Sequence, residues 1–160
     1  MAQLEKPIRV LFVCHGNICR SPMAHYVMEE LVRRRGIEGA FVIDSAATSS
    51  EELGNPVHPG TRKVLEKHGI PCGGHRARRI RPDEAGCWDV IAVMDEANYR
   101  NTQRRLGLGA GSRDAEKVHM LLEFAGEERS VADPWYTGDF DTTFEDVYAG
   151  CSGLLGWLGF

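Results

Sequence analysis

A cysteine and an arginine stand six positions apart in one short segment, at Cys14 and Arg20, and Ser21 follows directly. A cysteine thiolate is a nucleophile. A guanidinium can hold two oxygens of a tetrahedral oxyanion with its planar pair of donors. The Ser21 hydroxyl can hydrogen-bond the sulfur when it acts as a leaving group. These residue types suit attack by Cys14 on a bound phosphoryl group.

The residues between Cys14 and Arg20 form a loop whose backbone N–H groups can point into one hollow. Gly16 and Asn17 tolerate the left-handed backbone that such a nest needs. A helix N-terminus behind the loop adds positive potential, which favours both the anion and the thiolate. Substrate contacts are expected from the loop residues His15, Gly16, Asn17, Ile18, Cys19 and Ser21, with His15 shaping the rim.

The element before this loop is a buried strand, because residues 8–13 are apolar and β-branched. A helix follows Ser21, with apolar residues at helical spacing and Gly36 placed to end it. Open α/β sheets bind ligands at the carboxyl ends of strands. This context favours the chemical interpretation over the alternative, in which Cys14 is a small buried residue and Arg20 a solvated one.

The same alternation continues along the chain and predicts an α/β fold. Strands are expected at residues 41–43, 88–94 and 118–121, and helices at 61–68, 96–106 and 143–158. Asp95 is placed to cap the second of these helices. The pattern predicts a small parallel four-stranded sheet with helices on both faces, in one domain over residues 1–160. Residues 107–112 are glycine-rich and are expected to form a surface loop.

The composition limits the classes of function. The 160 residues carry 19 Lys and Arg against 23 Asp and Glu, a formal charge of −4, which argues against nucleic-acid binding. There is no apolar run of roughly 18 residues, so we expect no membrane association and a cytoplasmic protein. Five cysteines in a chain of this size indicate reduced thiols rather than a disulfide framework.

Phosphoryl transfer from an ester also needs an acid for the leaving oxygen and then a base for water, and one carboxylic acid can do both. The candidate is Asp133, whose backbone is restrained by Pro134, with Trp135 and Tyr136 as pocket walls. The alternative is that Asp-Pro marks a turn and that the two aromatic residues belong to the core.

Several short segments follow one another along the chain: VLFVC at 10–14, GNICRSP at 16–22, DSAATS at 44–49, GNP at 54–56, HGIP at 68–71, His75 with Ala77 and Arg78, MDE at 94–96 and DP at 133–134. In these segments and in their order the sequence resembles the low-molecular-weight protein tyrosine phosphatases. The resemblance implies a flavodoxin-like fold of the phosphotyrosine protein phosphatase I type. It also implies hydrolysis of phosphotyrosine in protein substrates, with phosphate and other tetrahedral oxyanions as product or inhibitors.

The resemblance carries roles for single residues. It implies that Cys14 is the nucleophile that forms a phosphocysteine, Arg20 the phosphate clamp and Asp133 the acid and then base. No metal or organic cofactor is implied, and the protein is expected to be a monomer or weak homodimer. A loop-supporting hydrogen-bond network is implied for Asn17, Ser21, Ser45 and His75. Cys19 resembles a redox partner that traps oxidised Cys14 as a disulfide, and the alternative is a simple buried thiol beside the loop.

Other residues keep two interpretations or depart from the family pattern. Asp95 matches a family acid near the site, and a helix cap explains it equally well. Glu51-Glu52 stands where many members carry an aromatic wall, so stacking on a substrate ring would depend on Trp135 and Tyr136. The basic run at residues 75–81 is either a steering patch or a solvated face. The remaining cysteines, Cys72, Cys87 and Cys151, are interpreted as packing residues.

Three alternative functions stay open from the sequence. A thioredoxin-coupled arsenate reductase would need two further cysteines close together, whereas Cys72 and Cys87 are fifteen positions apart. A protein-arginine phosphatase would call for threonine in place of Ile18. A non-catalytic phosphate-binding or redox-sensing module would bind phosphate without turnover.

Overall fold

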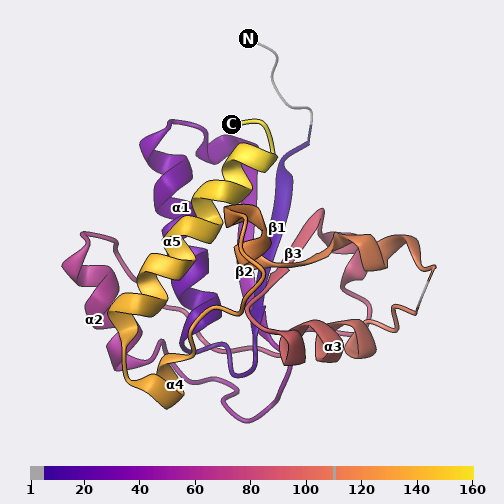
Figure 1. The fold of residues 1–160 in the computed structure, drawn as a ribbon, viewed down its shortest axis with the longest axis horizontal. Coiled ribbons are helices and arrows are strands. Elements are labelled where there is room, and N and C mark those ends of the chain that lie inside the picture. Colours follow the sequence, from indigo (N-terminus) through magenta and orange to yellow (C-terminus); the bar gives the residue numbers. More distant parts are fainter. Residues whose placement is uncertain (1–5, 110) are drawn as a thin grey trace.

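The computed structural model describes residues 6–109 and 111–160, and its centre is a four-stranded parallel sheet (Figure 1). The strands are β1 (Ile8–Cys14), β2 (Phe41–Ala47), β3 (Val90–Val93) and β4 (Val118–Met120), in the spatial order β2-β1-β3-β4. Every strand pair is parallel, which confirms the predicted fold class. The carboxyl ends of all four strands therefore meet at one edge, where Cys14 ends β1.

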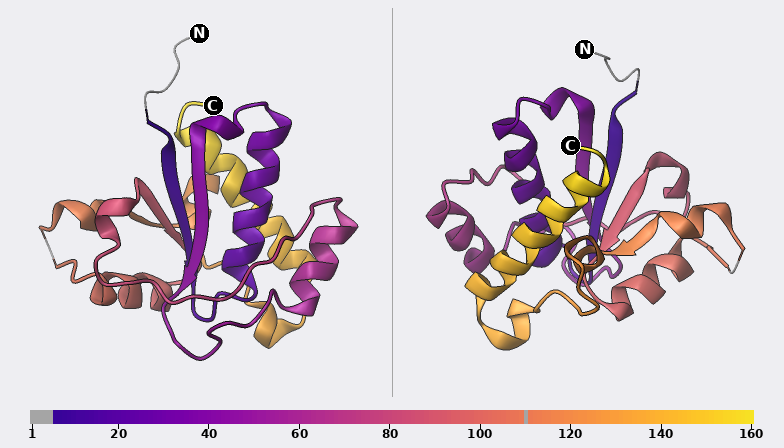
Figure 2. Two further views of the ribbon diagram at one scale, coloured as in Figure 1. Left: turned by 180° about the vertical axis from the view of Figure 1, so that it is seen from behind. Right: turned by 45° about the horizontal axis from the view of Figure 1, so that its top comes forward.

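Helices cover both faces of the sheet (Figure 2). They are α1 (Arg20–Arg34), α2 (Pro59–Lys67), α3 (Glu96–Arg105), α4 (Pro134–Thr137) and α5 (Phe140–Trp157). One apolar cluster joins Val10 and Phe12 of β1 to α1 and α5. A second joins Leu11 and Val13 to the face that carries α3. Because β1 contributes alternate side chains to two cores, it is buried on both faces, as its apolar run predicts.

Several element boundaries differ from the predicted ones. The strand β2 extends four residues further, to Ala47, while β3 begins only at Val90 and leaves Trp88 packed in the core just before it. The helix α5 begins at Phe140 because the Asp139 carboxylate accepts a hydrogen bond from Thr142 N at 3.0 Å. Of the predicted surface loop 107–112, Ala110 lies outside the described residues.

The long helix α5 lies directly against the segment Leu121–Ala125, with glycines at the contact. A Cβ added to Gly153 would lie 2.1 Å from the carbonyl oxygen of Phe124. A Cβ on Gly156, one turn later, would meet open space. The close approach of backbone to backbone therefore depends on glycine at one of these two positions.

Among the helices of the described residues, none has the length and apolar character needed to cross a membrane.

Candidate active site

The sulfur of Cys14 lies at the end of β1 and is surrounded by hydrogen-bonding groups. It is 3.0 Å from Ser21 Oγ, and it accepts hydrogen bonds from the backbone N–H groups of Asn17 at 3.3 Å and Ser21 at 3.4 Å. Donors that converge on a sulfur at a helix N-terminus stabilise the thiolate. The loop thus presents Cys14 as a nucleophile, with Ser21 beside it.

Asn17 holds the loop in its shape. It is fully buried and has a left-handed backbone with φ of 59°. Its side chain donates to Ser21 Oγ at 2.8 Å and accepts from the backbone N–H of Arg78 at 3.1 Å. Its carbonyl oxygen is 2.8 Å from His75 Nε2. These contacts with Ser21, Arg78 and His75 stabilise a backbone conformation that costs about 1–3 kcal/mol.

Of the two loop residues that tolerate a left-handed backbone, Asn17 adopts it and Gly16 does not. The absence of a side chain at Gly16 matters for close packing instead. A Cβ there would lie 3.3 Å from Glu52 Cγ, so the missing side chain makes room for the segment opposite the loop.

Arg20 is buried and lies between two acids. Its Nη2 donates to Asp95 Oδ2 at 2.9 Å and is 3.3 Å from Asp133 Oδ2, while Nη1 donates to the carbonyl of Val131 at 3.2 Å. The other oxygen of Asp95 accepts from Asn98 N at 2.7 Å and caps α3. Both interpretations of Asp95 therefore hold at once, one for each oxygen.

Asp133 caps the short helix α4, since its Oδ1 accepts from the backbone N–H of Trp135 at 3.1 Å. This bond fixes the carboxylate at the mouth of the loop. Trp135 is 62% exposed and Tyr136 84% exposed, so neither aromatic residue belongs to the core. Both line the cleft, as expected of pocket walls.

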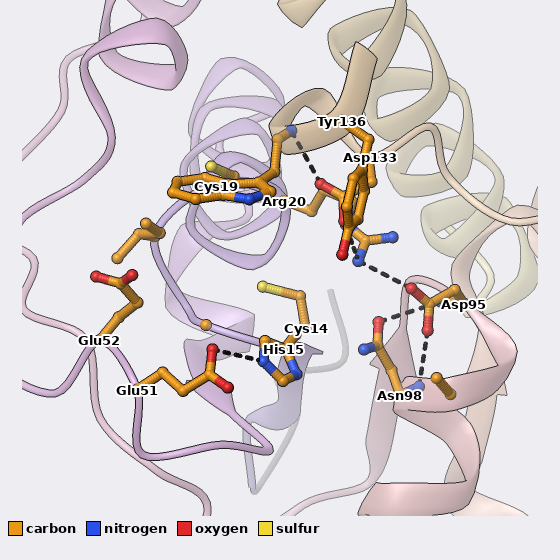
Figure 3. Close-up of a pocket in the computed structure, with 14 residues that line it drawn as sticks. Cys14, His15, Cys19, Arg20, Glu51, Glu52, Asp95, Asn98, Asp133 and Tyr136 are labelled. Atoms are coloured by element: carbon orange, nitrogen blue, oxygen red, sulfur yellow. Dashed lines mark hydrogen bonds and ion pairs between the residues drawn. The ribbon is translucent and has the colours of Figure 1, made fainter. Parts of the chain in front are cut away.

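The cleft above Cys14 has a volume of about 390 Å³. Figure 3 shows Glu51 and Glu52 on one side of Cys14, and Asp95 with Asn98 on the other. Glu51 Oε2 is 3.0 Å from His15 Nε2, which places His15 at the rim. Residues 14–16 and 18–20 of the loop also line the cleft. Asn17 does not, because it is turned inward as a support, and Ser21 lies buried behind the sulfur.

Ser45 lies on β2 and makes its contact with a residue that the sequence analysis missed. Its hydroxyl is 3.3 Å from His25 Nδ1, and the His25 ring packs edge-on against the His75 ring. Ser45 therefore reaches the support network through His25 rather than by direct contact with Asn17 or Ser21. His25 follows the motif by one helical turn of α1, and that spacing is the only signal that could have pointed to it.

Part of the basic run at residues 75–81 forms ion pairs within the protein. Arg78 pairs with Glu84 at 2.6 Å and with Asp44 at 3.1 Å, and its backbone N–H supports Asn17. Arg81 pairs with Asp83 at 3.3 Å. Burial lowers the pKa of His75, which favours the neutral ring beside the Asn17 carbonyl.

The remaining cysteines differ in environment. Cys19 is buried near Cys14, and burial, followed by the charge of Cys14, raises its pKa to about 12. Cys151 is fully buried in the core, as predicted. Cys72 is half-buried. The interpretation of Cys87 as a packing residue is wrong, because it is exposed at the end of a single 3₁₀ turn, Ala85–Cys87, where the chain turns back towards the sheet.

Within residues 6–109 and 111–160, no group of three or more His, Cys, Asp or Glu side chains is arranged to hold a metal ion. Fold and site together define an α/β protein with a cysteine-containing anion-binding loop at the carboxyl edge of its sheet.

Residues 9–159 match the family described as low molecular weight phosphotyrosine protein phosphatase, and the chain belongs to this family. It is 36% identical over 150 residues to the low molecular weight protein-tyrosine-phosphatase YfkJ of Bacillus subtilis, covering 92% of this chain and 94% of that protein. It is 38% identical over 152 residues to PtpA of Staphylococcus epidermidis, covering 94% of each chain.

Solved structures agree with this assignment. The crystal structure of Bacillus subtilis YfkJ superposes with a TM-score of 0.88 at 35% identity, covering 96% of this chain and 95% of that one. The drosophila arginine phosphatase DARP superposes with a TM-score of 0.86 at 25% identity, covering 96% and 99%.

Proposed function

We propose that the protein hydrolyses phosphotyrosine in proteins, and small aryl phosphates, through a phosphocysteine intermediate on Cys14. The observation that carries this proposal is the convergence of three hydrogen-bonding groups on Cys14 Sγ, with Arg20 and Asp133 facing the same cleft.

In the first step Cys14 Sγ attacks phosphorus, so that an S–P bond forms and the P–O bond to the tyrosine breaks. Arg20 and the loop N–H groups hold the other phosphate oxygens, where charge develops. Asp133, in its protonated form, gives its proton to the departing phenolate oxygen.

In the second step the Asp133 carboxylate takes a proton from water as that water attacks phosphorus. The S–P bond breaks and the electron pair returns to sulfur, where Ser21 Oγ, 3.0 Å away, stabilises the thiolate. Inorganic phosphate leaves. Cys14, Arg20, Asp133, the loop N–H groups and water supply every proton and charge in this scheme, so it calls for no metal or organic cofactor.

The proposal is tested with an aryl phosphate assayed in the presence of a chelator. Cys14→Ser should lower kcat by about 10³-fold or more. Cys87→Ser, which removes an exposed thiol outside the cleft, is the matched control and should retain full activity. Turnover that survives Cys14→Ser would reject the phosphocysteine mechanism.

The choice of tyrosine over arginine depends on Ile18, which lines the cleft. A branched apolar side chain suits the ring of a phosphotyrosine. Because the chain is also similar to an arginine phosphatase, phosphoarginine is tested as the second substrate class. We expect higher kcat/KM for a phosphotyrosine peptide than for a matched phosphoarginine peptide. A higher kcat/KM for the phosphoarginine peptide would mean that the protein is an arginine phosphatase.

An arsenate reductase relay is disfavoured by the position of Cys87. Its carbonyl accepts from Arg9 Nε at 2.7 Å near the start of β1. Cys14 ends that strand, about 16 Å further on at roughly 3.3 Å per residue. Arsenate-dependent oxidation of reduced thioredoxin would support the relay. A non-catalytic module would instead bind phosphate without hydrolysing any aryl phosphate.

We also propose that Cys19 protects Cys14 from irreversible oxidation. Peroxide converts the Cys14 thiolate to a sulfenic acid, the Cys19 sulfur attacks it, water leaves with the proton of the Cys19 thiol, and an S–S bond forms. A thiol reductant then restores both cysteines. After peroxide treatment, the wild-type protein should regain a larger fraction of its activity with dithiothreitol than Cys19→Ala. Equal recovery would reject the role.

A further inference from the structure

A second hollow adjoins the catalytic cleft and has no part in the mechanism above. Arg79, Arg104 and Arg105 line it together with the buried Thr48. His15 and Glu51 line both hollows and form the rim between them. A group bound in the second hollow would therefore lie beside a phosphotyrosine bound over Cys14.

None of the three arginines is neutralised by an acid in the part of the chain that the structure describes, and two of them are positioned by carbonyl groups. Arg79 Nε donates to the carbonyl of Thr48 at 3.0 Å, and Arg105 Nε donates to the carbonyl of Ile80 at 2.9 Å. None of the three has a carboxylate of the described residues within 4.0 Å, unlike their neighbours Arg78 and Arg81. In Arg79 and Arg105 the bond from Nε orients the guanidinium, while the two terminal nitrogens remain available. Those nitrogens form the edge that binds carboxylate or phosphate bidentately.

Thr48 provides an independent observation in the same hollow. Its side chain is only 6% exposed, and its Oγ1 has no hydrogen-bond partner among the described residues. Buried hydroxyl groups nearly always have a partner, and this one stands as a donor without a partner of the described residues beside three arginines. A hydroxyl can donate to an anionic oxygen, as the arginines can.

The spacing of the two hollows fits one extended substrate. Arg79 forms a β-bridge with Ala47, and Ala47 is the register partner of Cys14. Two steps between neighbouring chains at about 4.8 Å each separate the Cα atoms of Arg79 and Cys14 by about 10 Å. That distance corresponds to about three residues of extended peptide at roughly 3.3 Å per residue. An acidic group a few residues from a phosphotyrosine can therefore reach the arginines.

We propose that Arg79, Arg104, Arg105 and Thr48 form a second anion subsite, which binds a carboxylate or a second phosphate on the phosphotyrosine-containing substrate. This proposal rests on the proposed function, and it adds a substrate class: peptides with an acidic or phosphorylated residue near the phosphotyrosine. The Glu51 carboxylate at the rim would repel a bound anion, but its Oε2 already contacts His15 Nε2 at 3.0 Å.

The test compares three peptides that share one phosphotyrosine. One has neutral flanks, one carries glutamates three residues away on either side, and one carries phosphoserines there. We expect the wild-type kcat/KM to be about five- to tenfold higher for an anionic peptide than for the neutral one, with the preference weakened by salt. The glutamate and phosphoserine peptides distinguish the two sources of the anion.

Two variants locate the effect. In the double variant Arg79→Gln, Arg104→Gln the ratio between anionic and neutral peptides should fall to within about twofold of one. Arg100→Gln is the matched control, because Arg100 lies on α3 with Arg104 but lines a different hollow. It should keep the wild-type ratio.

A wild-type ratio near one, or a ratio that the double variant leaves unchanged, would overturn the subsite. If the wild-type protein hydrolyses no phosphotyrosine peptide and no aryl phosphate, the proposed function fails instead. The subsite is then judged by the affinity of Cys14→Ser for the anionic and neutral peptides. Equal affinities would overturn it independently of turnover.

Discussion

Arg20 and Asp133 are in contact at the cleft: Arg20 Nη2 is 3.3 Å from Asp133 Oδ2. A phosphate bound in the loop would form an ion pair with Arg20 and would bring negative charge close to the Asp133 carboxylate. In the proposed mechanism Arg20 holds that phosphate and Asp133 protonates the leaving oxygen. The contact therefore joins the proposed phosphate clamp directly to the proposed proton donor.

Asp133→Asn removes the proton donor but keeps the shape of the side chain and its ability to cap α4. We expect kcat to fall by about 10²- to 10³-fold for an aryl phosphate with a poor leaving group. The loss should be much smaller for a good leaving group, which departs without a proton. Inorganic phosphate should inhibit at an equal or lower concentration, because a negative charge next to Arg20 is gone. Steady-state kinetics over a series of aryl phosphates measures both effects.

Asp139→Asn is the control for this variant, since Asp139 caps the neighbouring helix α5 and does not line the cleft. It should change kcat little and equally for all leaving groups. Equal losses in Asp133→Asn across the series would remove Asp133 as the acid.

Gly153 and Gly156 make a matched pair for the packing of α5. Ala at position 153 would place its Cβ against the Phe124 carbonyl, so Gly153→Ala should lower the free energy of unfolding by about 3 kcal/mol. Gly156 is exposed and its Cβ would meet open space, so Gly156→Ala should be neutral or raise stability by about 0.5–1 kcal/mol. Urea unfolding of both variants tests the contrast, and similar effects in both would contradict it.

The sheet and the motif could be predicted because both depend on local patterns. Alternating apolar strands and helices define the parallel sheet, and its edge then determines where Cys14 must lie. The helix cap at Asp95 could be predicted from its position before residues 96–106. The second bond of Asp95, to Arg20, could not, because it joins two elements 75 positions apart in the chain.

The support of the loop was harder to predict because backbone groups supply much of it. The N–H of Arg78 and the carbonyl of Val131 hold Asn17 and Arg20, and every residue type has these groups. Ser45 and His25 meet only because β2 and α1 pack together. The residue types also could not decide which of Gly16 and Asn17 has the left-handed backbone, because both tolerate it.

Asn17 combines a left-handed backbone with buried side-chain hydrogen bonds, and two substitutions separate these contributions. Asn17→Ala loses the bonds to Ser21 and Arg78 and keeps the backbone strain, so it should destabilise the protein by about 3 kcal/mol. Asn17→Gly loses the same bonds without the strain and should be milder by about 1 kcal/mol. Thermal unfolding measures both. Equal stabilities would show that strain at this position contributes nothing.

Asn17→Gly should also lower kcat, although it is the milder variant in stability. The bond from Asn17 Nδ2 orients the Ser21 hydroxyl towards Cys14 Sγ, and glycine cannot replace it. Aryl phosphate kinetics at a temperature where the variant is fully folded would detect the loss. Wild-type kcat in Asn17→Gly would mean that Ser21 needs no such orientation.

The neutral His75 ring makes stability depend on pH. Burial lowers its pKa in the folded protein, the hydrogen bond to the Asn17 carbonyl opposes this, the nearby charges of His25 and Arg78 lower it further, and Asp44 raises it. The unfolded chain, with a value near 6.5, therefore binds more protons than the folded protein as pH falls below neutrality. The His75 contribution is complete above pH 6.5 and is lost as pH falls through the folded value. We expect the free energy of unfolding to decrease between pH 7.5 and 5.

His75→Gln keeps a donor for the Asn17 carbonyl but cannot titrate, so the difference between the two proteins isolates His75 from the other histidines. The wild-type protein should lose more stability than His75→Gln over this interval, and the two curves should converge at lower pH. Urea unfolding should be run without phosphate, since an anion bound in the loop would stabilise the folded state and change with pH itself. Parallel curves would mean that His75 titrates alike in the folded and unfolded protein, and would remove it as the source of the pH dependence.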